Sequence, residues 1–136
     1  MKYWLIKPEP STWSWNDQVT KKTTGWDGVR NYQASNNLKS MLVGDLCFFY
    51  HSGSDRQVMG IVEVTQPYHP DPSDETGRFG MVAVTLFKPL PNPVSLNSIK
   101  HDSRLAHLAL VRQSRLSVMP IDKPSWDLIL KMGKEP

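Results

Sequence analysis

One stretch of nine residues, Trp26 to Ala34, carries side chains suited to holding a flat, polar ligand. Trp26 offers a ring face for stacking, Arg30 a fork of hydrogen-bond donors, and Asn31 an amide edge. The rim of a ligand pocket is one interpretation of this mixture. The other is a half-buried tryptophan in front of a capped helix, which is common in proteins. Residue types alone leave both interpretations open.

A wider group of residues shares this chemistry. Aromatic rings, bidentate cations and amides together can hold a nucleobase that has left its stack. Taken singly, each member also fits a structural role, since Phe49 and Tyr50 can be core residues and Arg115 a surface cation. Only their joint occurrence favours a base site. The group comprises Trp26, Arg30, Tyr32, Phe49, Tyr50, His51, Arg112, Gln113 and Arg115.

Catalytic chemistry has weaker support in the sequence. His51 is the best candidate for a general base because it precedes Ser52. Arg30 and Arg115 could then stabilise an anion. Neighbouring residues on an extended strand, however, point to opposite faces. We therefore interpret His51 as a strand-end residue or ligand donor, and keep an enzyme acting on a nucleotide or RNA as the alternative.

The sequence gives no sign of a cofactor or metal site. It has no Gly-rich phosphate loop, no G-x-S-x-G elbow and no metal-spaced cluster, and its 4 histidines are scattered. Cys47, the only cysteine, lies between Leu46 and Phe48 and fits a small apolar core residue. We expect no cofactor, no metal and no disulfide.

Size and composition predict one soluble domain, residues 1–136. A hydrophobic fraction of 39% without an apolar run near twenty residues excludes a membrane span. The net charge of +3, from 16 Lys+Arg against 13 Asp+Glu, permits an anionic partner. Lys7 and Pro8 interrupt any secretory signal. We expect a cytoplasmic monomer, nucleoid-associated in a bacterium or nuclear in a eukaryote.

Periodicity and capping residues predict the elements that position these side chains. Ser14 and Asn31 fit helix N-caps, and proline-rich segments predict a surface loop at 67–77 and a stiff connector at 88–93. Three consecutive strands between helices favour an α+β fold on an antiparallel sheet or small barrel. The expected strands are 3–6, 46–51 (buried on both faces), 58–64, 80–87 and 113–119, and the expected helices are 15–22, 32–41, 95–100, 103–110 and a C-terminal helix ending at Gly133.

Several motifs follow one another along the whole chain. Residues 26–34 read W-D-G-V-R-N-Y-Q-A, 49–52 read F-Y-H-S, and 112–120 read R-Q-S-R-L-S-V-M-P. Residues 3–10 read Y-W-L-I-K-P-E-P, and 68–71 read Y-H-P-D. Together these motifs resemble those of the EVE domain family, whose usual opening is W-L-M-K-S-E-P. A proline stands here at residue 8 in place of the family's serine, so a contact from that serine cannot be carried over.

The resemblance implies a PUA-like fold, which is a small antiparallel β-barrel flanked by helices. It implies a non-enzymatic protein that binds modified DNA, with RNA as the alternative carrier. The expected ligand is a flipped modified base, with modified cytosine favoured. Residues 26–32, 49–52 and 112–117 would form three walls, and Lys7 and Glu9 would close the mouth. The implied base-binding residues are Lys7, Glu9, Trp26, Gly28, Val29, Arg30, Asn31, Tyr32, Phe49, Tyr50, His51, Ser52, Arg112, Gln113, Arg115 and Ser117.

Overall fold

A six-stranded sheet forms the frame of the molecule in the computed structural model, which describes residues 1–8, 13–52 and 56–134. Neighbouring strands follow the order β2-β5-β4-β3-β1-β6. Glu9 lies outside the described residues. The strands are β1 (Tyr3–Ile6), β2 (Thr23–Trp26), β3 (Leu46–His51), β4 (Gln57–Pro70), β5 (Gly80–Ser95) and β6 (Val118–Ile121).

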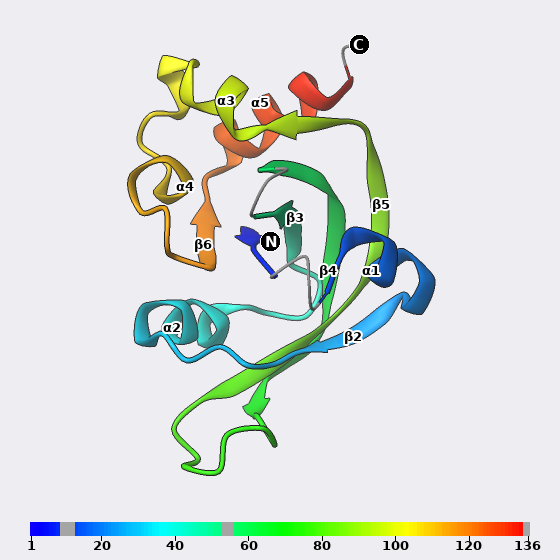
Figure 1. Cartoon of the computed structure of the whole chain (residues 1–136), viewed down its shortest axis with the longest axis vertical. Helices are drawn as coiled ribbons and strands as arrows, with labels where there is room; N and C mark the ends of the chain where they lie inside the picture. Colours follow the sequence, from blue (N-terminus) through cyan, green and yellow to red (C-terminus); the bar gives the residue numbers. More distant parts are fainter. Residues whose placement is uncertain (9–12, 53–55, 135–136) are drawn as a thin grey trace.

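The two longest strands, β4 and β5, bend around β3 and the N-terminal strand (Figure 1). Their antiparallel ladder contains four register shifts, which allow this bending. Both strands are longer than the sequence predicts. The predicted loop at 67–77 begins as strand up to Pro70, and the predicted connector at 88–93 is part of β5. Prolines are tolerated there because β2 and β3 do not pair with these outer portions, so one side of each strand needs no N–H donors.

A short strand, β2, was missed by the periodicity, which treated residues 23–25 as the end of a helix. Thr23 to Trp26 pair antiparallel with β5, and Trp26 lies opposite Val82. The preceding residue, Lys22, has φ of 69°, which turns the chain sharply out of the helix. Trp26 is therefore the last residue of an edge strand.

The C-terminal third also differs from the prediction. The helix expected at 103–110 is two short turns, η1 (Ser103–Leu105) and α4 (Ala109–Arg112). The strand expected at 113–119 begins only at Val118, where pairing with β1 starts. Gly133 lies inside α5 (Lys123–Lys134) rather than ending it. A Cβ at Gly133 would meet the Asn92 carbonyl oxygen at 3.2 Å, so this glycine permits close packing on β5.

The sheet contains one parallel pair, which the prediction of an antiparallel sheet did not include. β1 runs parallel to β3 and antiparallel to β6. A parallel pair needs a long connection, and the chain between β1 and β3 provides it through α1 (Trp15–Lys21), β2 and α2 (Tyr32–Ser40). Within the described residues no ladder joins the edge strands β2 and β6. The fold is therefore α+β with a six-stranded sheet, and a closed barrel is not confirmed.

Three predicted helices are confirmed close to their expected ends. Ser14 caps α1 (Trp15–Lys21) and forms a reciprocal capping box with Asp17. Asn31 caps α2 (Tyr32–Ser40) through a 2.9 Å bond from the Ala34 amide. Ser95 caps α3 (Leu96–Lys100). None of the helices in the described part of the chain is long and apolar enough to span a bilayer.

β3 is buried on both faces, as its aromatic run predicts. The Phe48 ring stacks on Trp126 of α5, with 3.8 Å between ring centroids. On the other face, the Phe49 ring makes edge-to-face contacts with Trp15 and Trp26. The distances between ring centroids are 5.1 Å and 5.8 Å. The neighbouring strand contributes Gly60, where a Cβ would collide with the Trp15 ring. This glycine lets the Trp15 ring reach Phe49.

Gly60→Ala should destabilise the protein by about 1–3 kcal/mol, because the added methyl group displaces the Trp15 ring in a packed core. Urea unfolding followed by circular dichroism measures this loss. Gly25→Ala is the matched control on β2, since its Cβ would meet only the flexible end of Met81. Equal stability of the Gly60→Ala protein and the wild type would contradict the packing described for Trp15.

Candidate functional site

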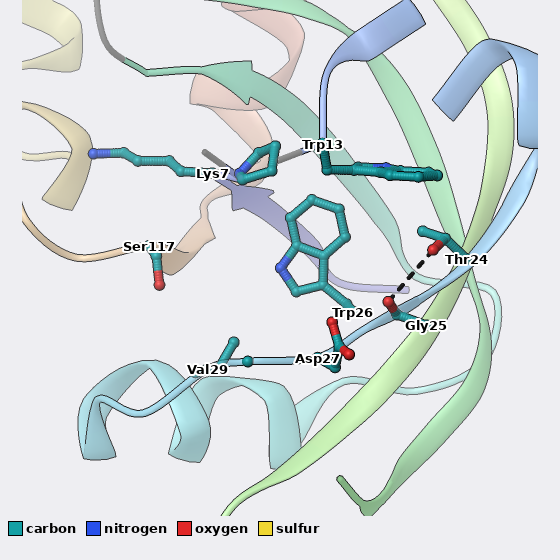
Figure 2. A pocket seen from close by; sticks show the side chains of 10 residues that line it. Lys7, Trp13, Thr24, Gly25, Trp26, Asp27, Val29 and Ser117 are labelled. Atoms are coloured by element: carbon teal, nitrogen blue, oxygen red, sulfur yellow. Dashed lines mark hydrogen bonds between the residues drawn. The ribbon is translucent and has the colours of Figure 1, made fainter. Parts of the chain in front are cut away.

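A cavity of about 470 Å³ opens where the end of β2 approaches the segments that follow β1 and precede β6. Ligand sites for small molecules commonly have volumes of 300–1,000 Å³. Figure 2 shows the Trp26 indole at its centre, with Lys7, Trp13 and Ser117 around it. The lining residues are Lys7, Pro8, Trp13, Thr24, Gly25, Trp26, Asp27, Gly28, Val29 and Ser117.

The Trp26 indole lines this cavity and is nearly buried. Only 6% of the residue is exposed, and its ring is held edge to face against Phe49 at an interplanar angle of 83°. Its Nε1 atom has no hydrogen-bond partner among the described residues, yet it is not buried. In Figure 2 this nitrogen faces the side on which Ser117 lies. The cavity therefore presents a fixed ring with an available donor.

Charged groups stand at the border of the cavity. The Lys7 amide donates to the Ser117 carbonyl at 2.9 Å, and its ammonium donates to the Ser114 carbonyl at 3.2 Å. The same ammonium lies 5.3 Å from the centre of the Tyr50 ring. Partial burial lowers the pKa of Lys7 below its usual value. Across the cavity, Asp27 is exposed and has no hydrogen-bond partner among the described residues.

The segment after Trp26 is fixed by one buried carboxylate, that of Asp71. Gly28, whose φ is +78°, donates its amide to Asp71 Oδ2 at 2.8 Å. Arg30 Nη1 donates to the same oxygen at 3.2 Å, and Arg30 Nη2 donates to Ser73 Oγ at 3.0 Å. Ser73 completes the cluster through its amide and hydroxyl, which both donate to Asp71 Oδ1.

The Asp71 carboxyl is strongly acidic in this setting. Burial by itself would raise its pKa, but hydrogen bonds from Ser73, Gly28 and Arg30 together outweigh that effect and lower the pKa from 3.8 to about 2. Asp71 therefore carries a negative charge at neutral pH. It ties the loop after β4 to the segment that forms the cavity wall.

A second, more open hollow of about 310 Å³ is lined by residues 31 and 33 and by residues 112–116. These two segments adjoin Val29 and Ser117, which line the first cavity. Arg112 ends α4, and Asn31 caps α2, so the hollow lies between these two helix ends. Its lining contains amides, a hydroxyl and two guanidinium groups, without an aromatic ring. The lining residues are Asn31, Gln33, Arg112, Gln113, Ser114, Arg115 and Leu116.

The structure divides the predicted base-binding residues among several places. The first cavity contains Lys7, Trp26, Gly28, Val29 and Ser117. The second hollow contains Asn31, Arg112, Gln113 and Arg115. Lining neither are Arg30, Tyr32, Phe49, Tyr50, His51 and Ser52.

The expected strand wall lies behind the cavity rather than on its surface. Phe49 is 0% exposed and Tyr50 only 2%, so these rings support the lining. His51 Nε2 accepts a 2.8 Å hydrogen bond from the Trp15 amide, and Ser52 Oγ donates to the Pro8 carbonyl at 3.2 Å. An apolar strand in the middle of a sheet is covered on both faces, which explains why its side chains do not line the cavity in this structure.

Two further predicted residues point elsewhere. Arg30 is bound to Asp71 and Ser73, as described above. Tyr32 is 62% exposed and its ring lies 5.0 Å from that of Phe79. Both residues belong to the segment Trp26 to Ala34, called the signature segment below. Their positions show that neighbouring residues of this segment face different directions.

Several lining residues were not among the predicted set. Trp13 is not part of any motif quoted above, and its half-buried ring lines the cavity. Asp27 was passed over although it lies inside the signature segment. The remaining unpredicted lining residues are Pro8, Thr24, Gly25, Gln33 and Ser114.

Comparison with known proteins decides the family. The sequence description of the EVE domain matches residues 2–132, nearly the whole chain. The chain belongs to the EVE domain family. This confirms the resemblance of its motifs.

Relatives of this EVE domain include proteins of animals and bacteria. Thymocyte nuclear protein 1 of Rattus norvegicus is 31% identical over 164 residues, which cover 96% of this chain and 73% of that protein. A protein of Agrobacterium tumefaciens with a known crystal structure has 40% sequence identity to this chain. The two structures superpose with a TM-score of 0.95, and the match covers 100% of this chain and 97% of that one. The human THYN1 protein, crystallised in complex with DNA containing 5-methylcytosine, is 27% identical with a TM-score of 0.92, covering 100% and 99%.

In this EVE domain, successive residues of the signature segment have different structural roles. Residues 26–29 line the cavity. Arg30 and Gly28 donate hydrogen bonds to the same Asp71 oxygen, which holds this segment in place. Asn31 caps α2 and lines the second hollow. The cavity wall therefore depends on a residue more than forty positions away, since Gly28 and Asp71 are 43 residues apart.

Asp71→Asn should lower the free energy of unfolding of this EVE domain by about 1–2 kcal/mol at pH 7, a value reduced by the solvent exposure of Arg30. The folded-state pKa lies below the unfolded one, so the stabilisation exists above about pH 4 and disappears as the pH falls toward 2. Urea unfolding of both proteins across this pH range measures the difference. Glu75→Gln, a change in the same exposed loop, is the control. A difference that stays constant between pH 7 and pH 2 would contradict this account.

Proposed function

We propose that this EVE domain is a non-enzymatic reader of PUA-like fold that binds DNA and holds a flipped, modified base in the cavity around Trp26, with modified cytosine favoured. The observation that carries the proposal is the nearly buried indole, whose Nε1 donor is open to the cavity. Removing a base from its stack requires a ring to replace the lost contact and polar groups for its edges. The complex of the human THYN1 protein with 5-methylcytosine DNA supports DNA as the carrier.

The cavity offers a complementary group for each part of a cytosine. The Asp27 carboxylate can accept from the exocyclic N4 amine, which is the usual partner of acidic side chains on cytosine. Trp26 Nε1 and the Ser117 hydroxyl can donate to ring acceptors. Pro8 and Val29 supply apolar surface for a substituent such as a methyl group.

The residues that an enzyme would use here, His51, Ser52 and Arg30, make other contacts in the structure. His51 Nε2 already accepts from the Trp15 amide, and Ser52 Oγ donates to a carbonyl instead of to His51. Arg30, one of the proposed anion stabilisers, is paired with Asp71. These contacts favour binding without reaction. Mass spectrometry of modified oligonucleotides after incubation with excess protein tests this, and a changed mass would favour the enzyme.

Trp26→Ala should reduce the affinity for an oligonucleotide with one 5-methylcytosine by about 1–3 kcal/mol, the usual contribution of a base stacked on an aromatic ring. The preference over the unmodified oligonucleotide should disappear with it. Fluorescence anisotropy at fixed salt measures both affinities. Running the same sequence as RNA decides between the carriers.

Trp26→Phe is the matched variant, because it keeps an aromatic ring against Phe49 while removing the Nε1 donor together with the five-membered ring that carries it. We expect it to retain most of the preference at a loss of about 0.5–1.5 kcal/mol. Thermal melting of both variants shows whether they fold. If a folded Trp26→Ala protein still discriminates the modified base, the cavity is not the base site.

Asp27→Ala should lower affinity for modified cytosine by about 1–3 kcal/mol, since the acceptor for the N4 amine is lost. The side chain is exposed and has no hydrogen-bond partner among the described residues, so stability should be unaffected. Competition with free 5-methylcytidine and thymidine measures the effect on preference. Equal loss for both nucleosides would contradict a role in selecting cytosine.

A further inference from the structure

We infer that the second hollow is a phosphate site, in which Arg112 and Arg115 bind the backbone of the strand next to the captured base. The inference rests on the proposed function for the position of the strand. It assigns to the late R-Q-S-R segment a role different from the base wall that its motif implies. The chemical class of the ligand is a nucleic-acid phosphodiester.

The two guanidinium groups are available for an anion. Both residues are exposed, and neither side chain has an ion-pair or hydrogen-bond partner among the described residues. Two other arginines are paired with carboxylates, since Arg30 pairs with Asp71 and Arg104 with Asp102 at 2.7 Å. The lining of the hollow contains no acidic residue. Two uncompensated cations therefore share one concave surface.

The composition of this hollow fits a phosphate better than a base. It has no aromatic ring on which a base could stack, whereas the first cavity has two tryptophans. A guanidinium presents parallel N–H donors that match two oxygens of a phosphate. Asn31 and Gln113 add amide groups to the same surface.

The two sites are continuous along the chain, which gives a strand a path between them. On one segment, Val29 lines the cavity and Asn31 the hollow. On the other, Ser117 lines the cavity and its neighbour Leu116 the hollow. Lys7 stands at the boundary, lining the cavity while its ammonium bonds to the Ser114 carbonyl. A nucleotide with its base in the cavity therefore has its backbone directed toward three cations.

The test uses the double variant Arg112→Gln/Arg115→Gln and a single-stranded oligonucleotide with one 5-methylcytosine. Affinity is measured by anisotropy over a range of salt, because each phosphate contact contributes about 0.7 to the slope of log K against log salt for single strands. We expect the slope to become shallower by about 1.4 and affinity at 0.1 M salt to fall about 10- to 30-fold. The ratio of modified to unmodified affinity should remain that of the wild type.

Two variants control for charge alone. Lys131→Gln/Lys134→Gln removes the same net charge from α5, near the C-terminus (Figure 1), and should leave the slope unchanged. Arg112→Lys/Arg115→Lys keeps the charge and should preserve the slope while losing bidentate geometry.

Each outcome separates this inference from the proposed function. An unchanged slope in a folded double arginine variant overturns the phosphate site, whatever happens to base preference. Loss of preference with an unchanged slope would instead make these arginines part of the base wall. A shallower slope, together with a Trp26→Ala protein that still discriminates, keeps the phosphate site and overturns the base cavity. Polyglutamate that competes as well as the oligonucleotide would overturn a nucleic-acid ligand.

Discussion

The contact between the Trp26 indole and the buried Phe49 ring is the interaction on which the site depends. β2 is a four-residue edge strand whose only sheet neighbour among the described residues is β5, and backbone pairing alone does not fix the direction of its last side chain. Phe49 comes from β3, three positions away in the sheet order, and holds the indole at 5.8 Å from one side. Trp15 holds Phe49 in turn, and it reaches that ring only because position 60 is a glycine. An aromatic cluster in the core thus fixes the position of the indole that lines the cavity.

A second constraint acts on the cavity wall from outside. Asp71 is buried at 3% exposure and accepts hydrogen bonds from Gly28, Arg30 and Ser73. Its charge is stabilised by these donors, as the lowered pKa shows. The loop after β4 therefore acts on the site without lining it. Rigid support of this kind suits recognition of a base, because a preformed site loses less conformational entropy when it binds its ligand.

The cations of the protein differ in whether a carboxylate lies beside them, and this difference bears on nucleic-acid binding. A net charge of +3 is small, and most of it would have little directional effect if it were spread evenly. Some cations are paired with carboxylates, as Arg30 is with Asp71 and Lys123 with Asp127. Arg112 and Arg115, by contrast, have no ion-pair partner among the described residues, and both line the second hollow. Two cations with no acidic neighbour in the lining of the hollow therefore lie close to the base cavity.

The sequence by itself determined the family, the α+β class, the N-caps at Ser14 and Asn31, and β3 as a strand buried on both faces. These features depend on contiguous motifs and local periodicity, which a single chain displays directly. Only the tertiary structure decided which signature side chains face the cavity. The partner of Arg30 lies 41 residues away, and β2 exists because β5 is there to pair with it. Prolines were likewise tolerated in β4 and β5 because of missing neighbours on one side. Long-range pairing of this kind leaves no local pattern, which is why Arg30 was predicted on the wall and Asp27 was not.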